Sequence, residues 1–310
     1  MSYYLGIDTS NYTTSVCLYD SDCGKVISKR KLLPVREGEL GLRQSDAVFH
    51  HVQQLPDLFE DSFEGFSGSI KAIGVSYAPR TSEGSYMPCF TVGLAAAKIL
   101  SSVLKVPEYR FSHQQGHIAA ALYSVDRLDL LMQKHIAFHV SGGTTEALLV
   151  NCDEGFVSTQ IAAQTLDLNA GQLIDRVGVM LGLRFPCGKE LEKLALQYDE
   201  SIRVKTTLKG LDCCLSGGQN IAEKLLKDGK SPAYIARFTM TFIGAAISAM
   251  SFKIRERYGD LPFVYAGGVM SDSIIRNQLA AQHDCVFARP EFSSDNAAGT
   301  AVLAYIKDDL

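Results

Sequence analysis

Two histidines four residues apart are the first residues in the chain whose spacing could do chemistry. His113 and His117 lie in the segment SHQQGHIAAAL, and a helix starting near Ser112 would place both imidazoles on one face. Two imidazoles so arranged can hold a divalent metal ion, whose third ligand must come from elsewhere. Asp295, in SSDNAAG at another predicted helix start, is the best acidic candidate. Chance spacing of the histidines, with Asp295 as a helix N-cap, is the alternative interpretation.

The other histidines and the cysteines do not have the spacing of metal ligands. His135 and His139 lie in a predicted strand, where residues four apart share a face but stand about 13 Å apart. His50 and His51 are adjacent on a predicted helix and point in different directions, which favours packing or surface roles. None of the eight cysteines belongs to a C-x-x-C pair, which excludes a zinc ribbon.

Three short turns built from glycine or small side chains follow predicted strands. A backbone can approach a phosphate closely at glycine, which has no Cβ, and successive N–H groups can then bind the anion. Taken singly, a Gly-Gly pair is most often an ordinary turn. Repetition of such turns in both halves of the chain favours a nucleotide site. The turns are Asp8-Thr9-Ser10, Ser141-Gly142-Gly143-Thr144 and Ala266-Gly267-Gly268-Val269.

Hydrophobic periodicity predicts the elements that position these residues. The segment 3–33 alternates apolar and polar residues around a turn at 21–24, which indicates an antiparallel meander of strands. A helix at 45–63 with Ser45 as its N-cap, a strand at 70–76 and a helix at 91–104 follow. The predicted order is therefore β-β-β-α-β-α.

A second cycle of strands and helices begins near Lys134. Its predicted strands are 135–140, 146–150, 160–163 and 262–266, and its predicted helices are 169–181, 233–258 and 294–306. Two successive cycles, at about 150 residues per domain, indicate a duplicated α/β fold with two domains around a nucleotide cleft. We place the domains at 1–130 and 131–310, with the last helix able to pack back on the first domain.

Composition and charge limit the classes of function. Lysine and arginine total 30 and aspartate and glutamate total 34, so the net charge is −4 at pH 7. This balance is too acidic for a protein that grips nucleic acid through its bulk field, so a nucleic-acid partner would need a local patch or a helper subunit. A content of 46% hydrophobic residues excludes a disordered chain. No pattern sets an oligomeric state.

The sequence predicts neither a targeting segment nor a membrane span. The N-terminal residues MSYYLGIDTS contain no basic region and reach Asp8 before any apolar stretch could act as a signal peptide. We therefore expect a cytoplasmic protein with reduced thiols. The longest uncharged stretch, 238–252, is about 15 residues long and includes threonine, serine and glycine, so it predicts a buried helix rather than a span.

These motifs, taken in order, resemble those of the tRNA threonylcarbamoyladenosine synthase family (TsaD-type, formerly called O-sialoglycoprotein endopeptidases). The resemblance runs from Leu5 to about Tyr305 and implies the duplicated, RNase H-like fold of the actin-like and Hsp70-like ATPases and sugar kinases. Each motif alone is weak, whereas the ordered set is specific. The motifs are LGIDTS (5–10), HQQGH (113–117), VSGGTTEALLV (140–150), TLDLNAGQLIDRVGVMLGL (165–183), FPCG (185–188), LSGG (215–218), AGGV (266–269) and SSDNAAG (293–299).

The resemblance implies roles for individual residues. The family's H-x-x-x-H and DNAA motifs hold an iron or zinc ion, which implies His113, His117 and Asp295 as ligands here. The remaining motifs imply contacts with an adenine nucleotide, whether ATP, ADP, AMP or an acyl-adenylate: phosphates at 140–144, ribose and adenine elsewhere. No catalytic residue is assigned. The implied nucleotide or substrate residues are Asp8, Ser10, Val140, Ser141, Gly142, Gly143, Thr144, Asp175, Gly188, Gly267, Gly268 and Asp272.

The function implied by the resemblance is acyl transfer to tRNA. A threonylcarbamoyl group would pass from an adenylate to N6 of a tRNA adenine, in a position-37 type of modification, with one iron or zinc ion as cofactor. At this net charge, tRNA would bind through basic helper proteins, and family partner subunits are implied as well. The resemblance implies no membrane.

This chain departs from the family pattern on the side of the acceptor. Where the family reads T-S-C-D-E-T, residues 9–14 read TSNYTT, so two acidic groups near the reacting centre are missing. Thr144 replaces a histidine, Asp272 replaces an asparagine, and Cys187 replaces a glycine of a P-G-G motif. Residues 78–84 replace a glycine-rich G-P-G-L run. Such a pattern is expected of a divergent paralogue.

Three alternatives therefore stay open. The chain could be a carbamoyl or acyl transferase that uses another acceptor, an ATPase or sugar kinase of the same fold, or an ATP-binding, non-catalytic partner of a tRNA-modification complex. Three metal ligands are unusual in a kinase and unnecessary in a scaffold. A metallopeptidase is the least favoured, because the chain has no H-E-x-x-H motif.

Overall fold

The protein forms two units, each built on its own five-stranded sheet. The computed structural model describes residues 1–10, 12–34, 42–81, 83–153, 156–292 and 296–309. Unit 1 consists of Met1–Met132, Cys152–Ser158 and Glu291–Leu310, and unit 2 of Gln133–Asn151 and Thr159–Pro290. We predicted the domain boundary near residue 130. In addition, the chain returns to unit 1 at its end, because the last helix, α9 (Asn296–Asp309), belongs to that unit.

Unit 1 contains a mixed sheet in the order β3-β2-β1-β4-β5. The first three strands form the predicted antiparallel meander, while β1, β4 and β5 run parallel. The predicted β-β-β-α-β-α order is confirmed, and a further strand and helix follow it. The elements are β1 (Ser2–Ser10), β2 (Thr13–Asp20), β3 (Lys25–Leu32), α1 (Gln44–Phe63), β4 (Ser69–Ala78), α2 (Phe90–Leu104), β5 (Glu108–Ser112), α3 (His113–Tyr123) and η1 (Leu128–Met132).

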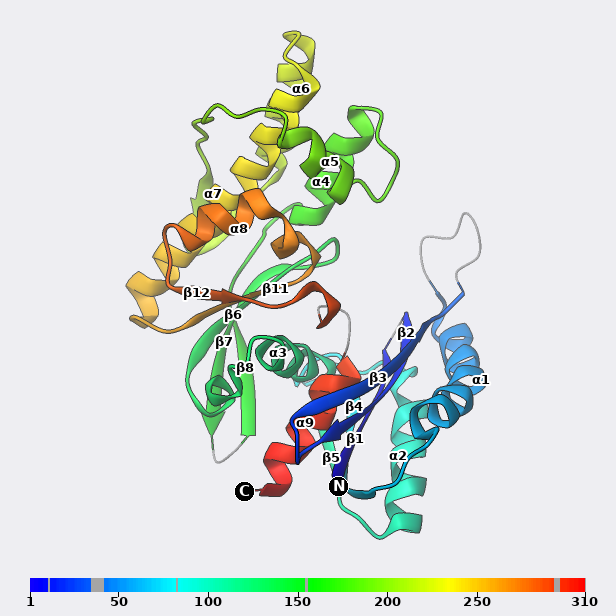
Figure 1. The fold of residues 1–310 in the computed structure, drawn as a ribbon. Helices are drawn as coiled ribbons and strands as arrows, with labels where there is room; N and C mark the ends of the chain where they lie inside the picture. Colours follow the sequence, from blue (N-terminus) through cyan, green and yellow to red (C-terminus); the bar gives the residue numbers. More distant parts are fainter. Residues whose placement is uncertain (11, 35–41, 82, 154–155, 293–295, 310) are drawn as a thin grey trace. The chain divides into compact units, whose positions relative to one another are not determined.

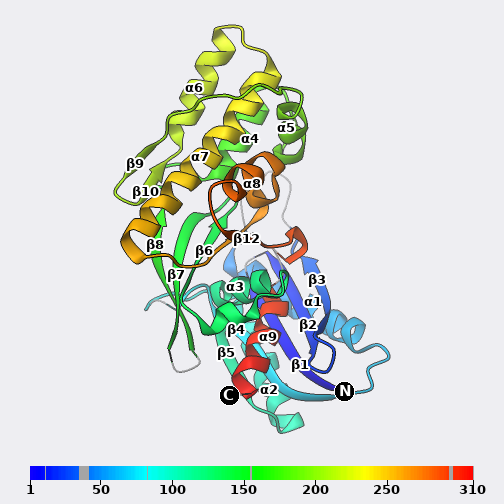
Figure 2. The same cartoon turned by 60° about the vertical axis from the view of Figure 1, so that its left-hand side comes forward.

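Small residues allow α9 to lie directly on this sheet. Helices α1 and α2 cover one face of the sheet, and α9 covers the other together with α3 (Figures 1 and 2). A Cβ added at Gly6 of β1 would stand 1.9 Å from the backbone oxygen of Ala297, and one at Gly299 would stand 1.8 Å from that of Gly116. Backbones this close fix the first turn of α9 against both β1 and α3.

Unit 2 contains the sheet order β12-β11-β6-β7-β8. Strands β6 and β7 are antiparallel, and β11 runs parallel to both β6 and β12. The elements are β6 (His135–Val140), β7 (Thr145–Asp153), β8 (Phe156–Gln164), α4 (Ala170–Met180), α5 (Gly188–Ala195), β9 (Thr207–Lys209), β10 (Asp212–Cys214), α6 (Ser216–Lys227), α7 (Pro232–Tyr258), β11 (Phe263–Ala266), η2 (Gly268–Ser271), α8 (Ser273–Ala280), β12 (Cys285–Phe287) and, where the chain passes from unit 2 to unit 1, η3 (Pro290–Phe292).

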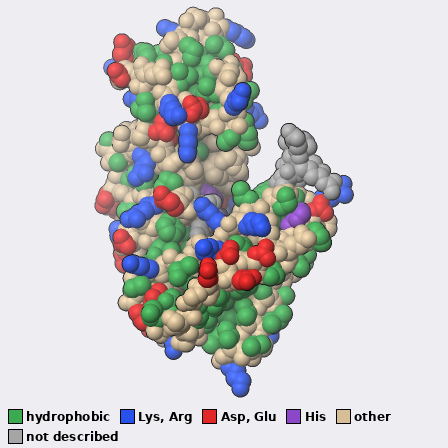
Figure 3. Space-filling view, turned by 45° about the vertical axis from the view of Figure 1, so that its right-hand side comes forward, with side chains coloured by type: hydrophobic (Ala, Val, Ile, Leu, Met, Phe, Trp, Pro, Cys, Tyr) green, Lys and Arg blue, Asp and Glu red, His purple; other side chains and the backbone are tan. Residues whose placement is uncertain are grey.

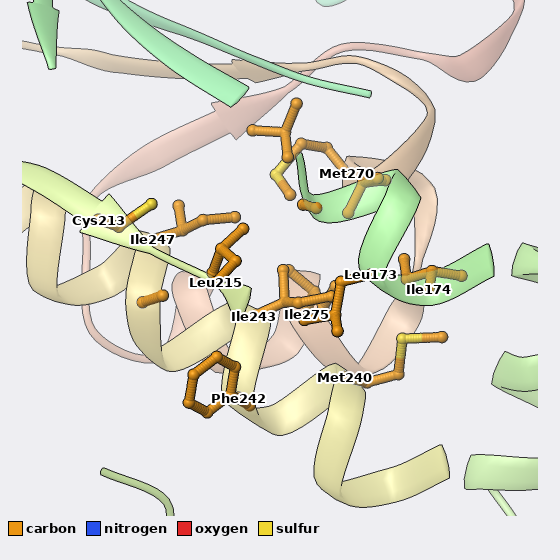
Figure 4. Packing of buried hydrophobic residues seen from close by; sticks show 14 of the residues in the cluster. Leu173, Ile174, Cys213, Leu215, Met240, Phe242, Ile243, Ile247, Met270 and Ile275 are labelled. Atoms are coloured by element: carbon orange, nitrogen blue, oxygen red, sulfur yellow. The ribbon is translucent and has the colours of Figure 1, made fainter. Parts of the chain in front are cut away.

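Helix α7 is the centre of the unit 2 core. Its residues Met240, Phe242 and Ile243 pack with apolar side chains of α4 and α8, as Figure 4 shows. The Ser231 side chain caps its start by accepting from the Tyr234 N–H. By length and composition α7 could cross a membrane, but 72% of its most apolar stretch is buried inside the structure. The predicted buried helix is thus confirmed.

One predicted cap is wrong, and several short elements were not predicted. Helix α1 begins at Gln44 with Arg43 at the N-cap, and no side chain caps it. The Ser45 hydroxyl instead contacts the Asp46 carboxylate at 3.4 Å. Helices α5 and α8 and strands β9, β10 and β12 were missed because they are short, and short apolar runs do not show a distinct period. The 12-residue helix α6 was also not predicted.

Candidate functional site

The two histidines of the predicted metal pair lie side by side on α3. The helix begins at His113 because Ser112 forms a capping box: its hydroxyl accepts from the Gln115 N–H at 3.2 Å, while the Gln115 side chain accepts from the Ser112 N–H at 2.6 Å. The rings of His113 and His117 then stand one turn apart, with centroids separated by 4.5 Å. The predicted common face is confirmed.

A buried asparagine joins these rings. The side-chain Nδ2 of Asn296, the first residue of α9, lies 2.9 Å from Nε2 of His113 and 3.2 Å from Nε2 of His117. The same Nδ2 lies 2.5 Å from Nδ1 of His113, so the Asn296 amide faces the edges of both rings. Asn296 is 2% exposed, and its Oδ1 has no hydrogen-bond partner among the described residues. Sequence reasoning missed Asn296, although it lies next to the aspartate that we chose.

The predicted third ligand cannot be placed. Asp295 lies outside the described residues, and within them no group of three histidine, cysteine, aspartate or glutamate side chains is arranged to hold a metal ion. The described part of the site thus supplies two neighbouring imidazole rings and the side-chain amide of Asn296, whose Nδ2 faces them. Nitrogen and oxygen donors of this kind suit both iron and zinc.

Asp8 lies beside the histidines of α3. Its Oδ1 is 3.0 Å from Nδ1 of His113, and its Oδ2 accepts from the Ser10 N–H at 3.3 Å. Burial alone would raise the pKa of Asp8, but the nearby His113 and hydrogen bonds from His113, Ser76 and Ser10 hold that pKa below its usual value. An ionised Asp8 fixes the orientation of the His113 ring.

The end of β1 is surrounded by uncharged polar groups. Thr14 shares hydrogen bonds with His51 Nδ1 at 2.8 Å and with Gln54 Oε1 at 2.9 Å. His51 is fully buried, and burial lowers its pKa to about 4, so it is neutral at neutral pH. This is the packing role expected of His51. Tyr12, where the family has an acidic residue, is 46% exposed.

In unit 2, the turn between β6 and β7 closes on itself and on the start of α4. The Ser141 hydroxyl accepts from the N–H groups of Gly143 at 3.3 Å and Thr144 at 3.1 Å. The Asn169 side chain donates to the Gly143 oxygen at 3.0 Å. These bonds fix the turn at a helix N-terminus, where the helix dipole favours an anion.

The glycines of the predicted site fall into two groups. Gly267 has a φ of 101°, and a Cβ there would lie 2.3 Å from the Val140 oxygen, so the fold itself requires glycine. Gly142, Gly143, Gly188 and Gly268 have no positive φ, and nothing described lies within 4 Å of an added Cβ. The fold gives no reason for glycine at these four positions, whereas a ligand close to the backbone would.

Asp175 lines an apolar pocket of unit 2. The pocket measures about 700 Å³, and its apolar wall includes Val179, Met180 and the 74% exposed Phe185. Asp175 lines it and accepts from the Cys187 N–H at 2.8 Å, which fixes the start of α5 at Gly188. Apolar walls with a few polar groups at the rim suit a flat aromatic ring.

Asp272 follows the turn at Gly267 and Gly268. Its Oδ1 caps α8 by accepting from the Ile275 N–H at 2.9 Å, whereas Oδ2 is buried without a hydrogen-bond partner among the described residues. Burial raises the pKa of Asp272 to about 6, and the Glu192 carboxylate contributes in the same direction. The ionised form of this aspartate is therefore destabilised near neutral pH.

Comparison with known proteins decides the family. The family model described as tRNA N6-adenosine threonylcarbamoyltransferase matches residues 33–302. The chain belongs to this family. A relative of that name from Thermosipho africanus (strain TCF52B) is 29% identical over 97% of this chain and 93% of its own length. Another, from Streptococcus pyogenes serotype M5 (strain Manfredo), is 28% identical over 99% and 91%.

Solved structures show the same fold at much lower sequence identity. Full-length HypF in its phosphate- and nucleotide-bound form is similar with a TM-score of 0.61 at 14% identity, over 99% of this chain and 46% of that one. Component A of (R)-2-hydroxyglutaryl-CoA dehydratase from Acidaminococcus fermentans has a TM-score of 0.54 at 15% identity, with both chains fully covered. The predicted actin-like α/β fold is confirmed, and the expectation of a transferase is confirmed by the family.

Proposed function

We propose that this family member transfers a threonylcarbamoyl group from an adenylate to N6 of a tRNA adenine. The proposal rests on family membership over residues 33–302 together with one observation, the pairing of the His113 and His117 rings one turn apart on α3, with the Asn296 amide against both. Two imidazoles that meet in this way are suited to holding a metal ion rather than to packing alone.

Unit 1 would hold the metal ion. His113 and His117 are its proposed ligands together with Asp295, and a bound iron or zinc ion would supply Lewis acidity towards the carbamoyl oxygen. Asp8 accepts the hydrogen of His113 Nδ1, which selects the tautomer whose Nε2 carries the lone pair. Buried Asn296 closes the other side of the ring pair.

Unit 2 would hold the adenylate. The backbone at Gly142 and Gly143 leaves room for a phosphate at the N-terminus of α4, where the helix dipole favours an anion, and this phosphate becomes the leaving group of the transfer. The apolar pocket beside Asp175 is the proposed seat of the adenine ring. Gly188, Gly268 and Asp272 are proposed to contact the same nucleotide.

The tRNA would need help to bind. The net charge is −4, and on the face shown in Figure 3 lysine and arginine side chains are interspersed with acidic ones rather than gathered in one basic field. We therefore propose that basic helper proteins or family partner subunits present the tRNA, in the cytoplasm.

A different acceptor is the second candidate function. No carboxylate stands at Tyr12 or Thr13, where the family has its acidic pair, and His51 nearby is buried and bonded to Thr14. The double variant Tyr12→Asp, Thr13→Glu would restore a group able to accept the proton of the attacking amine. A gain of roughly 10²- to 10⁴-fold in tRNA modification is expected if that proton transfer limits the rate.

The experiment supplies ATP, threonine, bicarbonate and an adenylate-forming partner, and offers the protein tRNA and small amines in parallel. Mass spectrometry reads both products. Threonylcarbamoylated adenine in tRNA supports the first function. A modified small amine without modified tRNA supports the second, and neither product with intact nucleotide binding rejects both in favour of a non-catalytic role.

A further inference from the structure

A second pocket in unit 2 contains none of the residues assigned to the nucleotide or the metal. It lies between α7, α8 and the segment that follows α5, and it measures about 390 Å³. Figure 1 shows α5, α7 and α8 as neighbours within the unit. This volume lies within the range of roughly 300 to 1,000 Å³ that is typical of small-molecule sites.

Two pairs of polar residues line this pocket from opposite helices. Arg237 and Thr241 are one turn apart on α7, and Ser273 and Asn277 are one turn apart on α8. Residues four apart share a helix face, so each helix presents a polar pair to the same space. Leu196 and Ile202 supply apolar walls. Both belong to the segment 196–202, which lines one side of the pocket.

Arg237 is the cation of the pocket. Its Nε is buried and has no hydrogen-bond partner among the described residues, and its positive charge acts on the nearby Asp272 carboxyl. A buried N–H group without an acceptor carries a desolvation penalty, which a bound acceptor would remove. The side chains of Thr241 and Asn277 also form no hydrogen bond within the described parts of the chain, so they are available to the same ligand.

Two carboxylates stand close to this arginine, and both have other partners. Glu192 Oε1 accepts from the N–H and the hydroxyl of Ser273, at 2.8 and 2.6 Å, and Asp272 caps α8. They fix the first turn of α8 and reduce the positive potential around Arg237. The balance of one guanidinium against two nearby carboxylates favours a ligand with a single oxyanion over a polyphosphate.

We propose that this pocket binds a small molecule through one oxyanion group, a carboxylate or a phosphate monoester, held by the Arg237 guanidinium. The planar guanidinium carries paired N–H groups that match two oxygens of such a group. The Thr241 hydroxyl and the Asn277 amide complete the shell, and Leu196 and Ile202 contact the carbon part of the molecule. The site is independent of the proposed transfer function.

The test is an NMR titration of the full-length protein with sodium acetate and, separately, with inorganic phosphate. The readouts are the Nε–H resonance of Arg237, assigned by its loss in Arg237→Gln, and the side-chain amide of Asn277. We expect one or both probes to shift these resonances. Acetate alone assigns a carboxylate, and phosphate alone assigns a phosphate monoester.

Three variants separate this site from other sources of binding. Arg237→Gln should weaken the response at Asn277 by about tenfold or more, because a charge-assisted bidentate contact is lost. Arg237→Lys should keep part of it, since charge remains without the fork. Arg203→Gln removes the same charge at an exposed position of the neighbouring segment and should change nothing. Gly143→Val blocks the turn between β6 and β7 and should leave the Arg237 response unchanged. That result excludes phosphate bound at this turn as the source of the response.

An Arg237 resonance that moves with neither probe overturns the proposal. So does a response of equal affinity in the native protein and Arg237→Gln. Because the native protein is titrated directly, the result stands even if a variant fails to fold. Loss of acyl transfer with an intact Arg237 response would reject the proposed function and leave this site in place.

Discussion

The two units present their candidate functional groups in opposite ways. In unit 1 the groups are side chains, Asp8, His113, His117 and Asn296, held by close packing of α9 on β1 and α3. In unit 2 many of them are backbone groups, at four glycines around which an added Cβ would meet nothing, besides the Asp175 and Asp272 carboxylates. Substitutions near the packed side chains of unit 1 should destabilise the fold. Substitutions at the open glycines of unit 2 should leave stability nearly unchanged but should weaken ligand binding.

The largest effect is expected from removing the imidazoles. His113→Ala combined with His117→Ala should abolish binding of one metal ion per chain, measured by elemental analysis of the purified protein. Lewis-acid catalysis contributes several kcal/mol, so transfer should fall by more than about 10²-fold. His50→Ala, on helix α1, is the control for loss of a histidine. Unchanged metal content in the double variant would contradict the assignment.

The glycines of the two units should respond differently to alanine. In Gly6→Ala the new Cβ collides with the Ala297 backbone, so the free energy of unfolding should fall by about 3 kcal/mol. Gly143→Ala should change it by less than about 0.5 kcal/mol. Urea denaturation measures both. Equal destabilisation of the two variants would show that the open turn is in fact constrained by packing.

Asp272 should make the stability of the fold depend on pH. Its folded pKa is raised from 3.8 to about 6, so the folded state binds this proton more tightly, and stability is lost as pH rises through that interval. Asp272→Asn keeps a cap for α8 and cannot ionise. It should be more stable than the native protein by up to about 3 kcal/mol above pH 6. The two should agree near pH 3, below both pKa values, and a constant difference across pH would contradict the raised pKa.

A smaller effect is expected in the apolar pocket of unit 2. Asp175→Ala frees the Cys187 N–H and removes a polar group from the pocket rim. ADP binding, measured by calorimetry, should weaken by about tenfold, the loss expected for one hydrogen bond to a charged group. Asp228→Ala, exposed at the end of α6, is the matched control. Equal affinity in both variants would remove Asp175 from the nucleotide site.

Local spacing predicted the parts of the molecule that depend on local geometry. The i, i+4 rule gave the shared face of His113 and His117, and alternation gave the β1–β3 meander. The contacts of these residues come from far along the chain: Asp8 meets His113 across 105 positions, and Asn296 meets it across 183. No local pattern specifies such partners, because packing of α9 brings them together.

The glycine turns illustrate a second limit. Gly143 and Gly267 have the same motif, Gly-Gly after a strand, yet only Gly267 is required by its own φ and by the nearby Val140 backbone. A sequence pattern cannot distinguish a glycine that the fold needs from one that a ligand needs. The predicted N-cap at Ser45 was wrong because α1 already begins at Gln44, so the serine lies inside the helix.

The imidazole pair of unit 1 is proposed to hold the metal ion that is needed for threonylcarbamoyl transfer to tRNA. The most direct measurement is a mass-spectrometric assay of N6-threonylcarbamoyladenosine in tRNA treated with the native protein, its adenylate-forming and helper partners, and the substrates of adenylate formation. We expect modified tRNA with the native protein. With the His113→Ala, His117→Ala double variant we expect more than about 10²-fold less modified tRNA, at unchanged ADP binding. Equal modification by both proteins would contradict it.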